Sequence, residues 1–270
     1  MKRVHVLEFE DLRWFPAWLR TAMTNVIVVF SRALGVTPVL ANLVSRTLKQ
    51  QGIEQIVDLG SGGGGVMPGV LARVRATPAT SGARLTMTDL YPNLDAIDTF
   101  NQPGAPELRY LPDPVDATNF SSSPQGLKTM VNCFHHMRPP MARAILKSAH
   151  DTGEPILIYE MGGSKIPFAI WLLGLPIALP LVALTALLLT PFVRPLTFRQ
   201  LFFTYVIPLV PIFYAWDGQA SMPRLYSLAD MDELLEGLDS PTYRWEKGPA
   251  PTEKGRTLGV YLLGVPVTQA

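Results

Sequence analysis

EQIVDLGSGGGG, residues 54–65, is the stretch that decides the fold. Its apolar residues predict a short buried strand ending near Leu59, and five of the next six positions are glycine, which lets a ligand approach the backbone closely. Residues 66–76 continue with helical spacing, and Pro68 fits the first turn of that helix. Such a turn is a frequent nucleotide site in open α/β sheets, because backbone N–H groups and the helix dipole converge there. We therefore predict an α/β sheet with a binding site at this turn.

Asp58 helps to separate two interpretations of the glycine loop. The spacing Gly60-x-Gly62-x-x-Gly65 also matches the dinucleotide fingerprint, but a carboxylate two residues before the first glycine would repel a pyrophosphate. The same carboxylate suits a ligand with an ammonium group or another positive centre, and S-adenosylmethionine has both. A dinucleotide enzyme and a purely structural glycine turn remain the alternatives at this point.

The pattern Asp58-x-Gly60-x-Gly62-x-Gly64 resembles motif I of class I S-adenosylmethionine-dependent methyltransferases. The resemblance implies that S-adenosylmethionine is the cofactor and that this loop surrounds its amino-acid end. The residues assigned to the cofactor on this basis are Asp58, Gly60, Ser61, Gly62 and Gly64.

The second predicted strand, residues 83–89, ends on an acid, Asp89. A carboxylate at the tip of the neighbouring strand can accept hydrogen bonds from both ribose hydroxyls of a bound nucleoside. Capping the helix that follows Pro92 is the alternative role for this acid. Leu90, the next residue, is expected to pack on the adenine.

Further cofactor contacts are expected after the third and fourth strands, which we predict at residues 107–111 and 127–133. The pair Asp116-Ala117 resembles the point where methyltransferases offer a carboxylate and a backbone N–H to the adenine, and an ordinary turn is the alternative. Cys133, at the end of the fourth strand, is also assigned to the cofactor site.

Three ionisable residues at strand ends are the catalytic candidates: His135 and His136 after the fourth strand, and Glu160 at the tip of the fifth. A histidine with a pKa near neutrality could take a proton from the methyl acceptor or orient it, and a structural hydrogen bond is the alternative. Adjacent residues point in different directions, so we do not expect both histidines to act together. No metal site is predicted, because the other two histidines are far away in the sequence and no ligand spacing appears.

Composition excludes several classes of function. The chain has 270 residues, with 23 Lys and Arg against 22 Asp and Glu, so its charge gives no reason to expect a nucleic-acid partner. Its single cysteine rules out an intramolecular disulfide and a cysteine-rich metal site, which fits a reducing compartment. The first residues lack the apolar run of a secretory signal, so we expect a cytoplasmic catalytic part at the inner face of the membrane.

Two long apolar runs concentrate the hydrophobicity. Residues 166–193 and 200–216 contain no formal charge. The first run is long enough to span a bilayer, but prolines interrupt it, and Arg194 and Arg199 between the runs would then face outward, against the positive-inside tendency. We favour a helical hairpin in one leaflet, with peripheral or monotopic membrane contact. A lid, a homodimer interface and true membrane spans are the alternatives.

The resemblance covers residues 54–160 and 217–264, and implies a doubly wound, Rossmann-like α/β sheet that is mostly parallel. Residues 242–246 and 257–264 are expected to close it as an antiparallel hairpin. The predicted domains are a helical cap (1–52), the cofactor-binding half (53–161), the apolar helical insertion (162–216) and the C-terminal part of the sheet (217–270).

The expected function is methyl transfer from S-adenosylmethionine to an O, N or C atom of a small, lipophilic acceptor. Small-molecule members of the superfamily, such as quinone-biosynthesis enzymes, are the nearest in pattern. A DNA amino-methylation motif of the Asn-Pro-Pro-Tyr type is absent, since the sequence reads Asn132-Cys-Phe-His. A nicotinamide-dependent oxidoreductase and a non-catalytic membrane-associated protein with a nucleotide fold are the competing functions.

Overall fold

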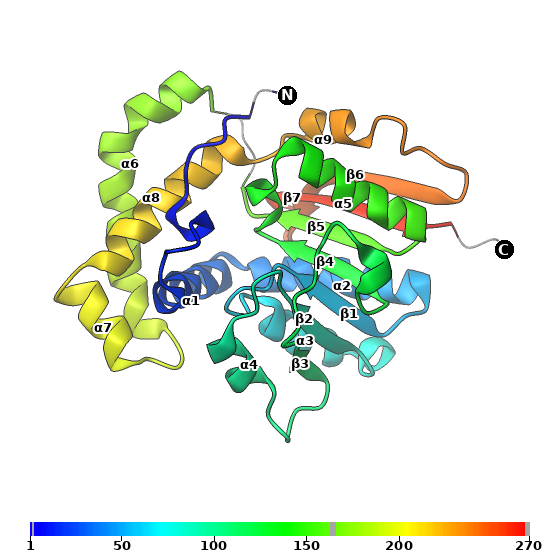
Figure 1. Cartoon of the computed structure of the whole chain (residues 1–270), viewed down its shortest axis with the longest axis horizontal. Helices are drawn as coiled ribbons and strands as arrows, with labels where there is room; N and C mark the ends of the chain where they lie inside the picture. The colour runs from blue at the N-terminus through cyan, green and yellow to red at the C-terminus, as the bar shows by residue number, and fades with distance from the viewer. Residues whose placement is uncertain (2, 163–165, 268–270) are drawn as a thin grey trace.

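A seven-stranded sheet forms the centre of the computed structural model, which describes residues 1, 3–162 and 166–267 (Figure 1). The strand order is β3-β2-β1-β4-β5-β7-β6, in which β1 to β5 are parallel and β7 runs antiparallel to both β5 and β6. This confirms the predicted fold class. The strands are β1 (Gln55–Leu59), β2 (Arg84–Thr88), β3 (Leu108–Tyr110), β4 (Leu127–Val131), β5 (Ile156–Glu160), β6 (Tyr243–Pro251) and β7 (Thr257–Pro266).

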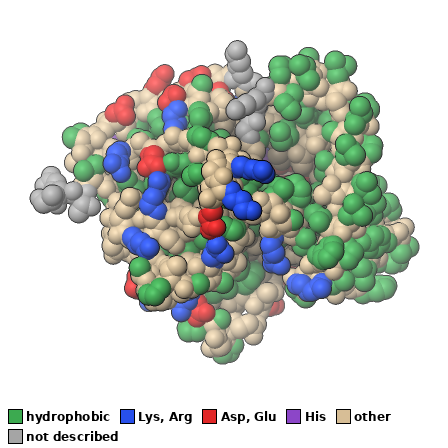
Figure 2. All heavy atoms as spheres, turned by 180° about the vertical axis from the view of Figure 1, so that it is seen from behind, with side chains coloured by type: hydrophobic (Ala, Val, Ile, Leu, Met, Phe, Trp, Pro, Cys, Tyr) green, Lys and Arg blue, Asp and Glu red, His purple; other side chains and the backbone are tan. Residues whose placement is uncertain are grey.

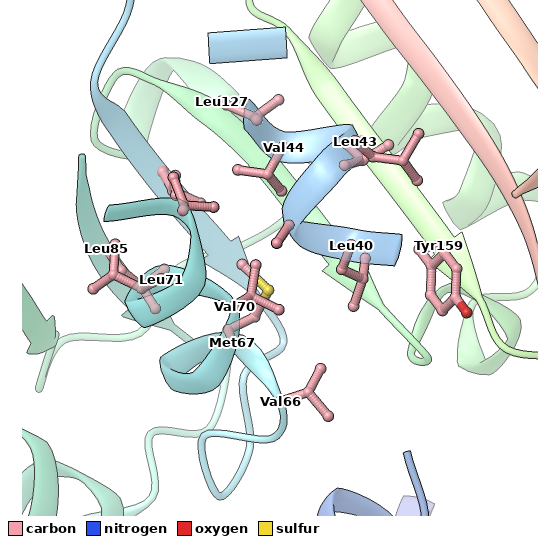
Figure 3. Packing of buried hydrophobic residues seen from close by; sticks show 14 of the residues in the cluster. Leu40, Leu43, Val44, Val66, Met67, Val70, Leu71, Leu85, Leu127 and Tyr159 are labelled. Atoms are coloured by element: carbon pink, nitrogen blue, oxygen red, sulfur yellow. The ribbon is translucent and has the colours of Figure 1, made fainter. Parts of the chain in front are cut away.

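Helices cover both faces of this sheet, which is why the central strands are almost continuously buried. On one face α2 and α3 pack on the strands, and Figure 3 shows Val44 and Val70 from these helices beside Leu85 and Leu127. On the other face lie α5 and α9. The helices around the sheet are α1 (Ala17–Leu34), α2 (Val36–Gln51), α3 (Met67–Arg75), α4 (Leu94–Phe100), α5 (Pro139–Thr152) and α9 (Leu228–Leu235).

The apolar runs form a separate group of helices at one side of the sheet (Figure 1). The helix α6 lies along α8, and both pack with α1 around a third apolar core that includes Leu19, Val26 and Val210. The members of this insertion are α6 (Phe168–Leu189), the 3-10 turn η5 (Thr190–Phe192), α7 (Phe198–Tyr205) and α8 (Leu209–Arg224).

Asp217-Gly218 has the composition of a turn, from which we would predict a break in the chain direction, but α8 continues through both residues to Arg224. Asp217 does not end the helix. Its carboxylate instead accepts hydrogen bonds from the backbone N–H groups of Phe9 and Glu10, at 2.8 and 3.0 Å. The helix therefore ties the N-terminal segment to the rest of the molecule.

One helix of the described chain, Phe168–Phe192, is long and apolar enough to cross a membrane, although only 11% of its most apolar window is buried. Two bent helix pairs, 17–51 and 198–224, would raise the number of such segments to three if each pair counted as one span. This finding rests on length and composition alone.

Four further 3-10 turns complete the described chain: η1 (Phe9–Asp11), η2 (Pro78–Thr80), η3 (Phe120–Ser122) and η4 (Phe134–His136). Of these, η4 follows β4 directly and η1 opens the path into α1. The N-terminal segment, dark blue in Figure 1, runs alongside α8 and brings η1 close to the carboxyl edge of the sheet.

Candidate functional site

The glycine loop is anchored by a buried carboxylate at the end of β1. Asp58 is 4% exposed, and its two oxygens accept hydrogen bonds from the hydroxyls of Ser61 (2.6 Å) and Thr129 (2.7 Å). Burial raises the pKa of Asp58 to about 6, against the opposing effect of these two hydrogen bonds. The carboxylate therefore organises the loop from beneath, because both of its oxygens are already occupied.

Glycine is required in this loop for backbone conformation and for space. Gly60, Gly62 and Gly64 have φ values of 69°, 50° and 98°, which side chains rarely adopt. A Cβ on Gly64 would lie 2.4 Å from the ring of Phe100, and one on Gly60 would lie 3.5 Å from the sulfur of Cys133. The loop consequently lies close against its neighbours.

Asp89 closes the loop from the tip of β2. Its carboxylate accepts hydrogen bonds from the backbone N–H of Gly62 (2.9 Å) and of Tyr91 (2.8 Å). Burial raises the pKa of this carboxyl, and the backbone hydrogen bonds oppose that effect. The alternative of a helix cap does not hold, because the side chain of Asn93 caps α4 by accepting from Ala96 N–H.

The other residues assigned to the cofactor lie around the same edge of the sheet. Leu90 is 45% exposed beside Asp89. The Asp116 carboxylate accepts hydrogen bonds from both the backbone N–H and the hydroxyl of Thr118, and these bonds stabilise a local turn. Ala117, the next residue, is half-buried. Cys133 donates to the carbonyl oxygen of Leu59 at 3.5 Å, and burial raises the pKa of its thiol.

Glu160 lies beneath His135 and uses both of its carboxylate oxygens to hold it. One oxygen accepts from the backbone N–H of His135 and the other contacts Nδ1 of the same residue, each at 2.9 Å. Glu160 is 1% exposed. The geometry therefore makes this acid a positioning residue for His135.

The two histidines lie side by side, contrary to the expectation that they would point apart. Their ring centroids are 4.3 Å apart with an interplanar angle of 34°. Both residues lie in the 3-10 turn η4, whose tight backbone brings the neighbouring rings together. His136 Nδ1 lies 2.8 Å from a carboxylate oxygen of Asp11, so His136 makes a long-range hydrogen bond as well.

Sequence reasoning missed a cluster of charged residues at this edge. Its acids come from the N-terminal segment, and its arginine, Arg224, comes from the end of α8. Glu8 is fully buried, and Arg224 Nη1 lies 2.9 Å from one of its oxygens and 2.7 Å from Asp11. Burial raises the pKa of Glu8. Residues 8 to 11 contain three acids in the sequence, but nothing local indicates that they meet residues 135, 136 and 224.

Known structures were compared with the whole chain. An O-methyltransferase family protein from Burkholderia thailandensis aligns over 92% of this chain and 59% of its own length, with a TM-score of 0.50 and 14% identity. Together with the strand order, this likeness decides the fold. The chain has the class I methyltransferase fold. No protein-family model and no curated protein sequence matches it.

Two other methyltransferase structures give weaker likenesses. The plantazolicin methyltransferase, solved in complex with S-adenosylhomocysteine, aligns over 92% of this chain and 97% of its own, with a TM-score of 0.48 and 12% identity. The mitomycin 7-O-methyltransferase aligns over 88% of this chain, with a TM-score of 0.46 and 18% identity. This chain covers only 56% of the mitomycin enzyme.

In a class I methyltransferase fold, ligands bind outside the carboxyl ends of the parallel strands, near the point where the strand order reverses. Here that point lies between β1 and β4. Asp58 is the penultimate residue of β1 and the glycine loop follows that strand, while His135 and His136 follow β4. The residues predicted for the cofactor and those predicted for catalysis therefore share one edge of the sheet.

Proposed function

We propose that this protein is an S-adenosylmethionine-dependent methyltransferase. The observation that carries the proposal is a pair of hydrogen bonds at the carboxyl edge of the sheet. The Asp58 carboxylate accepts one from the Ser61 hydroxyl, and the Asp89 carboxylate accepts the other from the backbone N–H of Gly62. These bonds place two carboxylates around a loop with little side-chain bulk. Such a site suits a cofactor that carries an ammonium group, a sulfonium centre and a ribose diol.

A nicotinamide dinucleotide fits the same site poorly. A pyrophosphate binds a glycine loop through free backbone N–H groups, and the N–H of Gly62 already donates to Asp89. The two carboxylates would also repel its negative charges. For these two reasons we place oxidoreduction with a nicotinamide cofactor second to methyl transfer, and the binding experiment below separates the two functions.

When bound, S-adenosylmethionine supplies an electrophilic methyl group on a positively charged sulfur. The chain itself has to position the acceptor atom in line with that methyl group and exclude water. His135 and His136 lie at the edge where the acceptor must approach, and Glu160 fixes the ring of His135. We assign these histidines to acceptor orientation, or to accepting the proton that an O–H or N–H acceptor loses.

We further propose that the acceptor is lipophilic and is reached at a membrane surface. Exposed apolar side chains occur along α6 outside the face that packs on α8, including Leu173 (80% exposed) and Ile177 (71%), and Phe198 at the start of α7 is 80% exposed. Figure 2 shows hydrophobic side chains gathered over this part of the molecule, on the right of the view. A helix that is apolar on every side needs an apolar environment on every side, which lipid provides more completely than a lid contact.

Calorimetric titration tests the cofactor. We expect the wild-type protein to bind S-adenosylhomocysteine and not NAD or NADP. Asp89→Asn should weaken that binding by about 10-fold to 100-fold, because an amide is a weaker acceptor for ribose hydroxyls than a carboxylate. The exposed acid Asp113 serves as the matched control in Asp113→Asn. Binding of NAD with no binding of S-adenosylhomocysteine would overturn the proposal.

Vesicle co-sedimentation tests the membrane contact. The triple variant Leu173→Ser, Ile177→Ser, Phe198→Ser should lose binding to vesicles of anionic phospholipid. The matched control replaces three exposed apolar residues outside the insertion, Leu34, Leu94 and Met141, with serine. Trp171 is left in place, because it is buried and donates to the carbonyl oxygen of Gln219. Equal vesicle binding by both triple variants would refute the membrane assignment.

A further inference from the structure

The strongest unassigned feature is the cluster in which the N-terminal segment meets the two histidines. One nitrogen of His135, one nitrogen of His136 and one carboxylate oxygen of Glu8 all lie within 4.8 Å of one another. These residues come from η4, which follows β4, and from the residue before η1. Imidazole nitrogens with a carboxylate oxygen are a frequent donor set for divalent transition metals.

Glu160 prepares His135 to act as a ligand. The contact between His135 Nδ1 and the Glu160 carboxylate, at 2.9 Å, places the ring proton on Nδ1. The opposite nitrogen, Nε2, then presents a lone pair and lies 3.9 Å from an oxygen of Glu8. A carboxylate that orients a histidine from behind is a common arrangement around protein-bound metals.

Buried atoms in the cluster lack hydrogen-bond partners. Among the described residues, His135 Nε2 and both carboxylate oxygens of Glu8 have none. The whole residue is 5% exposed for His135 and 0% for Glu8. Arg224 Nη1 lies 2.9 Å from Glu8 Oε1, but the lone pair of His135 Nε2 meets no donor among the described residues, and a cation between that nitrogen and the carboxylate removes the cost of burying them together.

Arg224 neutralises only part of the negative charge. Its Nη1 contacts Glu8 and Asp11, while Glu10 and Glu160 add two further carboxylates around the histidines. The Glu8 oxygen nearest to Arg224 is Oε1, and the other oxygen, Oε2, lies 3.3 Å from Nδ1 of His136. One side of the Glu8 carboxylate therefore remains directed at the histidines.

We propose that Glu8, His135 and His136 bind one divalent transition-metal ion, and that Zn²⁺ is the ion this donor set fits. Zinc binds nitrogen and oxygen at about 2.0–2.2 Å, so two ligands of a tetrahedral ion lie about 3.4 Å apart. The separation from Glu8 Oε2 to His136 Nδ1 is 3.3 Å and that from Glu8 Oε1 to His135 Nε2 is 3.9 Å, so the values lie on either side of this spacing. His136 Nδ1 now shares a proton with Asp11 at 2.8 Å, and metal binding displaces that proton and leaves the Asp11 carboxylate beside the ion.

The bound ion would fasten the N-terminal segment to the carboxyl edge of the sheet. Glu8 precedes η1 and α1, and Phe15, which lies between them, packs with Leu19 of α1 in the core shared with the insertion. Metal binding would thus link the apolar helices to the edge that carries the histidines. With the ion bound, the ligand nitrogens of His135 and His136 can no longer take a proton, so the histidines then serve only to orient the acceptor. The inference does not depend on the cofactor, because it concerns binding of the metal alone.

The test uses the full chain, first stripped with a chelator and then titrated with Co²⁺ and with Zn²⁺. We expect one equivalent of Co²⁺ to give the visible absorbance of a low-symmetry four-coordinate or five-coordinate ion, and one equivalent of Zn²⁺ to displace it. Zn²⁺ should also raise the melting temperature of the wild-type protein, since a ligand that binds the folded state stabilises it.

Two substitutions and one control locate the site. Glu8→Gln keeps the volume of the side chain, and we expect it to weaken Zn²⁺ binding at least 10-fold, as we do for His136→Ala. His150→Ala removes a histidine outside the cluster and should bind Zn²⁺ as the wild type does. Circular dichroism checks that each variant is folded. Absence of stoichiometric binding by the wild type, or unchanged binding by a folded Glu8→Gln variant, would overturn the proposal.

Discussion

Replacing Asp58 by asparagine should make the protein more stable at neutral pH. Asp58 is 4% exposed, and burial raises its pKa from 3.8 to about 6. Each pKa unit corresponds to 1.36 kcal/mol, so keeping this carboxylate ionised costs the folded state about 3 kcal/mol. An asparagine keeps both contacts, because its amide can accept from one hydroxyl, of Ser61 or Thr129, and donate to the other.

The sign of the pH dependence follows from the raised pKa. Below the unfolded value of 3.8 the carboxyl is protonated in both states and costs nothing. As the pH rises to about 6, the unfolded chain loses this proton first, so the wild-type protein loses stability, and above pH 6 the cost is constant. Asp58→Asn lacks this dependence. Its advantage should be about 3 kcal/mol at pH 8 and about half of that at pH 5.

Urea denaturation followed by tryptophan fluorescence, in a mild non-ionic detergent, measures both values. The exposed acid Asp113 provides the control, and Asp113→Asn should change stability by less than about 0.5 kcal/mol. Under the proposed function the same Asp58→Asn variant binds S-adenosylhomocysteine more weakly, so stability and binding change in opposite directions. A variant less stable than the wild type at pH 8, or an advantage that does not vary with pH, would refute the reasoning.

The remaining predictions concern stability. Gly126→Ala should cost more than about 2 kcal/mol, because Gly126 has a φ of 141° and a Cβ would lie 2.5 Å from the carbonyl oxygen of Gln55. Gly104→Ala, with open space and no positive φ, should leave the melting temperature nearly unchanged. Lys128→Met should lower the free energy of unfolding by about 2–4 kcal/mol, because it removes the buried ammonium group that lies 2.5 Å from the Glu154 carboxylate. Adding Glu154→Gln should recover more than half of that loss in chemical denaturation, and no recovery would mean that packing, not the unpaired charge, is responsible.

Much of the fold could be predicted because its signals are local. The strand before the glycine loop, predicted to end near Leu59, is β1, and the helix predicted over residues 66–76 is α3. The antiparallel hairpin at the end of the chain was also expected, and it is confirmed as β6 and β7. Alternation, glycine punctuation and helical spacing lie within a few neighbouring residues, so one sequence is enough to detect them.

The errors arose where tertiary contacts override a local signal. Asp217-Gly218 has the composition of a turn, yet α8 passes through it, because the Asp217 carboxylate is satisfied by backbone donors more than 200 residues away. The two adjacent histidines were expected to point in different directions. The hydrogen bonds from His135 to Glu160 accompany a 3-10 turn instead, and this turn brings both rings together.

The sequence by itself determined the glycine loop, since Asp58 and the glycines lie within eight consecutive residues and their conformational preferences are local. It also determined that a long apolar segment would need an environment other than water. Only the tertiary structure decided what surrounds the histidines. Glu8 lies 127 residues before His135 in the sequence, and Arg224 lies 89 residues after it. Their contacts depend on how the strands are ordered and on where α8 crosses the N-terminal segment. Periodicity carries no information about pairs so far apart, because side chains at that separation meet only after the whole sheet has formed.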